Sequence, residues 1–115
     1  MSQISKSNPL SHYHWGNGCD AWNLVDEHSL AIKLERMPAG ATEAIHVHAK
    51  ARQFFFILTG QATVEVEGKP FLVNPLEGMH IKPGERHSIA NNAQDPLEFI
   101  LCSEPSTLND RYNQV

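Results

Sequence analysis

The chain has 115 residues, of which 41% are hydrophobic, and a formal net charge of −4. This length suits one domain with a modest core, which we expect to span residues 1–115. The acidic balance and the scattered Lys and Arg residues argue against nucleic-acid binding, which requires a basic patch.

No stretch reaches the ~20 apolar residues that cross a bilayer, so we expect no membrane partner. The first eleven residues are polar and contain no apolar signal core. Cys19 and Cys102 are far apart and lack metal-type spacing, which is typical of two reduced thiols. These features predict a cytoplasmic protein.

Frequent glycine, proline and asparagine turn signals divide the chain into short segments, which favours an all-β sandwich or barrel. Residues 29–37 and 62–66 alternate between apolar and polar positions, as strands with one buried face do. Glu67-Gly68-Lys69-Pro70 predicts a hairpin turn into a strand at residues 71–73. Residues 97–102 predict a last apolar strand, and the polar tail at 103–115 is either a short cap or a loose extension.

The segment 53–58 is apolar at both parities after its first residue, so both faces of this strand should be covered. The inward parity comprises Gln53, Phe55 and Ile57, and the outward parity comprises Phe54, Phe56 and Leu58. A barrel this small has no second layer, so we expect a homodimer with the outward row in or near its interface. The alternative is that the N-terminal segment, with Tyr13 and Trp15, folds back over the row.

A metal site is indicated by His46 and His48, which are two residues apart and therefore share one face of a strand. Histidine is the commonest protein ligand for transition metals. His87, which follows a Lys-Pro-Gly turn, and the amide oxygen of Gln53 would complete a pocket if their strands lie alongside.

The spacing Gly40-x5-His46-x-His48-x4-Gln53-x6-Gly60 resembles the first motif of the cupin family, and Pro83-Gly84-x2-His87-x3-Asn91 resembles the end of the second. The family usually has glutamate in place of Gln53 and glycine in place of Leu76. The resemblance implies a small antiparallel β-barrel, or jelly roll, with its core at about residues 28–103. It also implies one divalent transition metal per subunit (Fe, Mn, Ni, Zn, Co or Cu) and carries over four ligands: His46, His48, Gln53 and His87.

Gln53 changes the chemistry that the resemblance implies. A neutral amide leaves the ion its full charge, which strengthens Lewis acidity and attracts an anionic substrate oxygen. It also removes a candidate general base. If Gln53 does not bind the ion, the site consists of three histidines and water.

A small-molecule pocket is indicated by two tryptophans, Trp15 and Trp22, which bracket a glycine-containing loop. Their rings either fill one end of the barrel as core or wall a pocket for a flat or sugar-like ligand. The candidate pocket residues are Trp22, Phe55, Ile57, Met79 and Trp15.

Further histidines lie outside the motifs. His12 and His14 are also two residues apart, and they supply a second metal patch, a partner contact or only a solvated strand. His80 alternates with Met79 and Ile81, so we expect these two to point inward and His80 outward.

Two classes of function remain open. The first is a metal-dependent enzyme acting on a small oxygenated or carbonyl compound, for which the similarity to quercetin dioxygenase-like cupins suggests a dioxygenase. The second is a non-catalytic module that binds a small molecule or a metal. A metal-dependent isomerase or epimerase would need a base, for which the sequence offers only His80, His28 or Tyr13.

Overall fold

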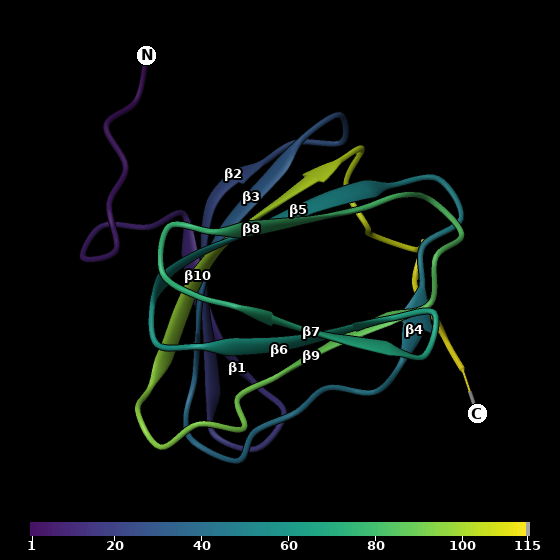
Figure 1. The fold of residues 1–115 in the computed structure, drawn as a ribbon. Helices are drawn as coiled ribbons and strands as arrows, with labels where there is room; N and C mark the ends of the chain where they lie inside the picture. The colour runs from purple at the N-terminus through teal and green to yellow at the C-terminus, as the bar shows by residue number, and fades with distance from the viewer. Residues whose placement is uncertain (115) are drawn as a thin grey trace.

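The computed structural model describes residues 1–114 and shows two antiparallel β-sheets that face each other (Figure 1). One sheet has six strands in the order β1-β2-β3-β10-β5-β8, and the other has five in the order β11-β4-β9-β6-β7. No helix among residues 1–114 is long and apolar enough to cross a membrane. The strands are β1 Ser11–Trp15, β2 Cys19–Asp26, β3 Ala31–Met37, β4 His46–Val47, β5 Arg52–Thr59, β6 Ala62–Val66, β7 Lys69–Val73, β8 Gly78–Ile81, β9 His87–Ala90, β10 Leu97–Glu104 and β11 Tyr112–Asn113.

The strands predicted from alternation are confirmed as β3 and β6, and the predicted last apolar strand is confirmed as β10. The hairpin is also confirmed, because Glu67 and Gly68 both have positive φ angles (50° and 80°), as a two-residue turn between twisted strands requires. The polar tail pairs as β11 with β4, so it is a short cap rather than a loose extension. Strands β1 and β2 precede residue 28, where we expect the core to begin, and widen the six-stranded sheet.

The core lies between the two sheets and confirms the parity expected for β5. Gln53, Phe55 and Ile57 are no more than 5% exposed, whereas Phe54 is 40% and Leu58 37% exposed on the outer face. Fully burying an aromatic or aliphatic side chain contributes roughly 1.5–3 kcal/mol, so the inward row anchors β5 in the core. The largest fully buried side chains include Phe99, Met37, Ile57, Ile81, Ile89 and Leu97.

The turn before β8 explains why the second cupin motif has glycine at the position that Leu76 takes in this chain. Leu76 has a φ angle of 66°, in the left-handed region that favours glycine. Gly78 lies two residues later, and a side-chain carbon there would collide with the ring of Phe54. The chain therefore keeps a glycine where two strands approach closely, and carries Leu76 in a strained backbone conformation.

The outward row of β5 is not covered by the aromatic residues of the N-terminal segment. Tyr13 and Trp15 lie on the face of β1 that points between the sheets, where they line a cavity. The fold-back alternative is therefore wrong for these two side chains. Phe54 and Phe56, whose rings lie 6.2 Å apart, form an apolar patch on the outside of the six-stranded sheet.

We predict that this patch packs against a second copy of the chain, because a row of exposed aromatic and aliphatic side chains favours a twofold contact. Phe56→Glu should then give a folded monomer in sedimentation velocity while the wild type sediments as a dimer. Leu72→Glu, which adds the same charge at an exposed position of the other sheet, is the control and should leave the dimer intact. Wild-type protein that sediments as a monomer at micromolar concentration would rule the dimer out.

Candidate metal centre

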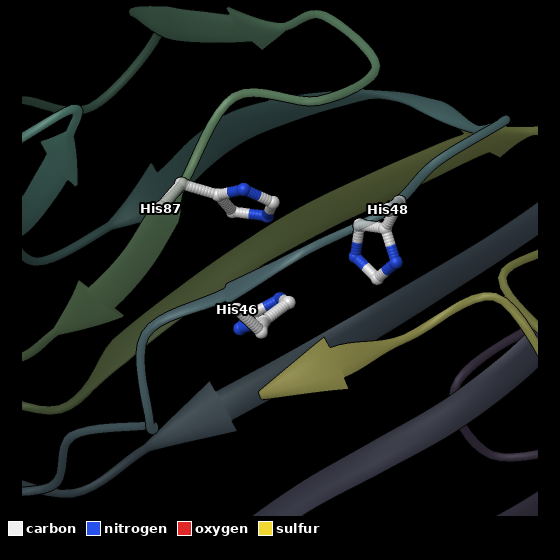
Figure 2. A group of neighbouring side chains, drawn as sticks. All are labelled: His46, His48 and His87. Atoms are coloured by element: carbon white, nitrogen blue, oxygen red, sulfur yellow. The ribbon is translucent and has the colours of Figure 1, made fainter. Parts of the chain in front are cut away.

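Three buried histidines meet between the sheets (Figure 2). His46 on β4 is directly opposite His87 on β9 in the strand register, and His48 follows two residues after His46. Their ring centroids lie 4.4 Å (His46–His87), 4.9 Å (His46–His48) and 5.3 Å (His48–His87) apart. One nitrogen from each ring lies within 4.8 Å of the other two, so the rings can share one ion.

The protonation of all three rings follows from their hydrogen bonds. In each ring Nδ1 lies 2.8–2.9 Å from a backbone carbonyl oxygen, which can only accept, so Nδ1 carries the proton and donates. Each Nε2 is left with a lone pair, and Nε2 of His48 is buried with no hydrogen-bond partner. An unpaired buried acceptor costs free energy, and a divalent ion would satisfy all three lone pairs at once. The carbonyl partners are Ala44 for His46, Asp110 for His48 and Glu85 for His87.

Burial keeps these imidazoles neutral, the form that binds metals. Loss of hydration lowers the pKa of His46 to about 3 and also lowers the pKa values of His48 and His87. At neutral pH no proton has to be removed before an ion enters. The three histidines can therefore bind a metal ion.

Gln53 reaches the same point from β5, on the opposite sheet. Its amide Nε2 donates to Ser103 Oγ at 3.0 Å, which turns Oε1 toward the histidines. Gln53 Oε1 lies 3.1 Å from His87 Nε2, so a carbonyl oxygen faces a nitrogen lone pair. Two acceptors at this distance repel each other unless a cation lies beside both. This donor set of three imidazoles and one amide oxygen fits a divalent transition metal.

Asp110 supports this site, although nothing in its sequence context indicates such a role. Its carboxylate accepts the backbone N–H groups of Ala49, Lys50 and Ala51 at 2.9–3.0 Å, while its own carbonyl holds His48. Burial raises the pKa of Asp110, but the three N–H donors outweigh it and the net pKa is lowered. Asp110 therefore fixes the turn that carries His48, from 62 residues away in the polar tail.

A cavity of about 210 Å³ adjoins the candidate metal ligands and is also lined by charged residues. Tyr13 Oη accepts a hydrogen bond from Lys33 Nζ at 2.8 Å, and Arg111 Nη1 lies 3.8 Å from Glu43 Oε2. Half of the remaining lining residues are apolar. The lining residues are Tyr13, Trp15, Lys33, Glu35, Glu43, His46, His48, Gln53, Phe55, Ile89, Phe99, Leu101, Thr107 and Arg111.

Two carboxyl groups in this cavity change protonation state near neutral pH. Burial raises the pKa of Glu35 to about 7, and burial together with the nearby Glu35 charge raises the pKa of Glu43 to about 8. Arg111 partly offsets both shifts, and the indole N–H of Trp15 lies near Glu35 in a geometry that falls short of a hydrogen bond. Glu43 Oε1 accepts the Ile89 backbone N–H at 3.1 Å. Such groups can act as acid or base catalysts.

The expected pocket residues separate into three places. Trp15 and Phe55 line the cavity, Ile57 is part of the closed core, and Met79 packs against that core. Trp22 lies on the outer face instead, where its ring stacks on His12 with centroids 4.9 Å apart. Its neighbour Ala21 takes the inward position opposite Tyr13, so strand alternation turns Trp22 away from the cavity.

The three candidate bases named from the sequence lie in different places. His80 is exposed between Met79 and the buried Ile81, as expected, and His28 is exposed in a turn. Only Tyr13 lies in the cavity. Glu35 and Glu43, in which the sequence shows no catalytic pattern, take the position that a base would need.

Gln53→Glu tests whether Gln53 contributes a ligand. A carboxylate at the same reach adds a negative charge, so we expect divalent metal to bind at least tenfold more tightly in competition with a chelator. Gln61→Glu introduces the same change at a side chain that bonds Asn74 outside the site, and should leave affinity unchanged. Equal affinity in the wild type and Gln53→Glu would place Gln53 outside the coordination sphere.

The raised pKa of Glu35 predicts a pH-dependent stability of metal-free protein. Its contribution is fully present below about 4.5, the unfolded value, and is lost as pH rises through about 7. From pH 5 to pH 8, the unfolding free energy of Glu35→Gln should therefore rise relative to wild type by roughly 1–3 kcal/mol. Denaturant titrations with chelator present measure this, with the exposed Glu27→Gln as control. If the unfolding free energies of wild type and Glu35→Gln change in parallel with pH, the fold does not destabilise the ionised form of Glu35.

Comparison with known proteins agrees with this architecture. The Cupin_2 family profile, described as a cupin domain, matches residues 33–103. The uncharacterised protein MJ1618 of Methanocaldococcus jannaschii is 28% identical over 69 residues, covering 60% of this chain and 55% of that protein. An oxalate-binding protein of Thermotoga maritima is 28% identical over 65 residues, covering 56% of this chain and 54% of its own length. The chain thus spans about half the length of these curated relatives.

Among solved structures, KdgF from Halomonas sp. superimposes with a TM-score of 0.83 over 94% of this chain and 98% of that chain. At 17% sequence identity, this likeness concerns the fold alone. The family profile covers more than half of the sequence, and the two sheets form the double-stranded β-helix of that family. The chain therefore belongs to the cupin family.

Proposed function

We propose that this cupin is a mononuclear divalent-metal enzyme that transfers a proton on a small, anionic carbonyl or hydroxy compound, as an isomerase, epimerase or lyase does. The observation that carries this proposal is that the buried three-histidine cluster and Gln53 adjoin a cavity that also holds two buried carboxyl groups and two cationic side chains. His46, His48, His87 and Gln53 would hold the ion. When bound, it would supply Lewis acidity to a substrate oxygen, with its charge undiminished by the neutral Gln53.

The cationic residues favour an anionic substrate. Lys33 and Arg111 both line the cavity, and Arg111 Nη1 lies 3.8 Å from Glu43 Oε2. Lys33 is held by Tyr13, which leaves its positive charge without a carboxylate partner among the ion pairs of residues 1–114. A carboxylate or phosphate that enters the cavity would neutralise this charge.

Glu35 and Glu43 would move the proton. A carboxyl with a pKa raised by burial is partly protonated at neutral pH, so its protonated form can donate a proton and its ionised form is a stronger base than an ordinary carboxylate. The apolar walls formed by Phe55, Phe99 and Leu101 exclude water from this exchange. At about 210 Å³ the cavity is smaller than the ~300–1000 Å³ of drug-sized ligand sites, which favours a small metabolite.

Two other functions draw on specific observations. The motif resemblance to quercetin dioxygenase-like cupins favours a dioxygenase, although Gln53 replaces the glutamate of that pattern. The Thermotoga maritima relative named an oxalate-binding protein favours a binding module for a small dicarboxylate. Oxalate would suit the metal donors and the cationic side chains without requiring Glu35 or Glu43.

One experiment separates the three functions. Protein purified without added metal is analysed for its elements, reloaded with single divalent metals and incubated in D2O with small keto acids, hydroxy acids, uronates and oxalate. We expect deuterium to enter a substrate carbon, with at least a hundredfold loss of rate in Glu35→Gln or Glu43→Gln and unchanged metal content. Glu27→Gln is the control.

The other outcomes contradict the proposal in different ways. Stoichiometric dioxygen uptake with product formation would identify a dioxygenase. Tight oxalate binding by calorimetry, with no turnover of any compound, would identify a binding module. Full activity in both carboxyl variants would exclude Glu35 and Glu43 as the proton-transfer groups.

A further inference from the structure

A second group of metal-ligating side chains lies on the outside of the six-stranded sheet, on the face opposite the cavity. His12 and His14 project from β1, and Asp20 lies directly opposite His14 on β2. Tyr13 and Trp15, which alternate with these histidines along β1, point the other way and line the cavity. One five-residue strand therefore carries a cavity wall on one face and a histidine pair on the other.

Both imidazoles converge on a single carboxylate oxygen. His12 Nε2 lies 2.9 Å and His14 Nδ1 2.8 Å from Asp20 Oδ1. The three ligand atoms all lie within 4.8 Å of one another. The ring of Trp22 stacks on His12 with an interplanar angle of 6°, which limits the orientations that His12 can adopt.

The carboxylate is the most sheltered member of this cluster, because the His12 and His14 side chains are 39% and 80% exposed. The Asp20 side chain is 19% exposed, and its hydrogen bond from His12 is the main cause of the lowered pKa of its carboxyl. Lys6 lies 4.6 Å above the ring of Trp22, but it is paired with Glu98 at 2.8 Å. Arg36 faces Asp20 in the strand register and weakens the attraction for a cation without filling the site.

We propose that His12, His14 and Asp20 form a second site, for a divalent ion of the Zn²⁺ or Cu²⁺ class, that clamps β1 to β2. Two imidazoles and one carboxylate are a ligand set that such ions accept, with the remaining positions taken by water. A tetrahedral ion with bonds of about 2.0–2.2 Å spaces its ligand atoms by about 3.4 Å. The rings would thus move back from Asp20 by about 0.5 Å, which exposed side chains allow.

The expected consequence is a stiffer cavity wall. β1 is an edge strand that pairs only with β2 among the strands of residues 1–114. An ion that bridges the two strands binds the paired state alone and stabilises it by mass action. Because Tyr13 and Trp15 are on the same strand, occupancy of the outer site would hold these two residues in place at the cavity.

Trp22 provides a local probe of the site. The chain has two tryptophans, so Trp15→Phe leaves Trp22 as the only tryptophan, whose emission is excited selectively at wavelengths that tyrosine does not absorb. In this background, Cu²⁺ should quench Trp22 fluorescence. Once the central site is filled, the quenching should saturate after one further ion per chain has bound. His12→Gln combined with His14→Gln should raise the Cu²⁺ concentration needed for half-maximal quenching at least tenfold. Asp20→Asn should weaken it too, and His28→Gln, an exposed histidine elsewhere, should not.

His48→Ala separates this site from the central one. We expect the variant to keep the Trp22 quenching, and Zn²⁺ should slow amide hydrogen exchange at residues 11–15 in it. Quenching that persists in the double histidine variant, or that disappears in His48→Ala, would overturn the outer site. Unchanged exchange at residues 11–15 with Zn²⁺ bound would overturn the clamp between β1 and β2.

Discussion

Three hydrogen bonds from imidazole Nδ1 to backbone carbonyls determine what the centre of this protein can do. Because a carbonyl cannot donate, each bond fixes both the tautomer and the orientation of its ring, and leaves an Nε2 lone pair facing the same point. Two of the carbonyls lie two residues before the histidines they hold, and the third belongs to Asp110 in the C-terminal segment. The site thus depends on the docking of β11 and the residues around it on β4.

The same burial that prepares the histidines makes the neighbouring carboxyls unstable in their charged form. Loss of hydration lowers the pKa of His46 and raises those of Glu35 and Glu43, so all three groups tend toward neutrality. A cavity of neutral groups attracts no particular ligand, but Lys33 and Arg111 add positive charge at its wall. A divalent ion would add more. An anion in the cavity would be attracted by these positive charges and would in turn stabilise them.

The sequence was sufficient to predict the parts of the site that depend on local spacing. His46 and His48 share a strand face by alternation, and the parity of β5 places Gln53 inside with Phe55. His87 required the motif resemblance, because its strand approaches β4 only in the folded chain. Asp110 and Arg111 had no local signal, since their roles arise from contacts between distant parts of the sequence.

Strand β3 shows a second limit of sequence reasoning, because alternation there does not tell which face is inside. Leu34 is buried on the outer face next to Trp22, whereas Lys33 and Glu35 point into the cavity between the sheets. In the middle of β3, polar side chains on the inner face and an apolar side chain on the outer face reverse the usual arrangement of a half-buried strand, whereas Ala31 and Met37 at its ends are buried on the inner face. The reversal is tolerable because the inner face at this point lines a cavity rather than packed core. The polar inner positions of β3 at Lys33 and Glu35, and the sheltered Leu34 between them on the outer face, therefore both follow from the presence of a cavity between the sheets.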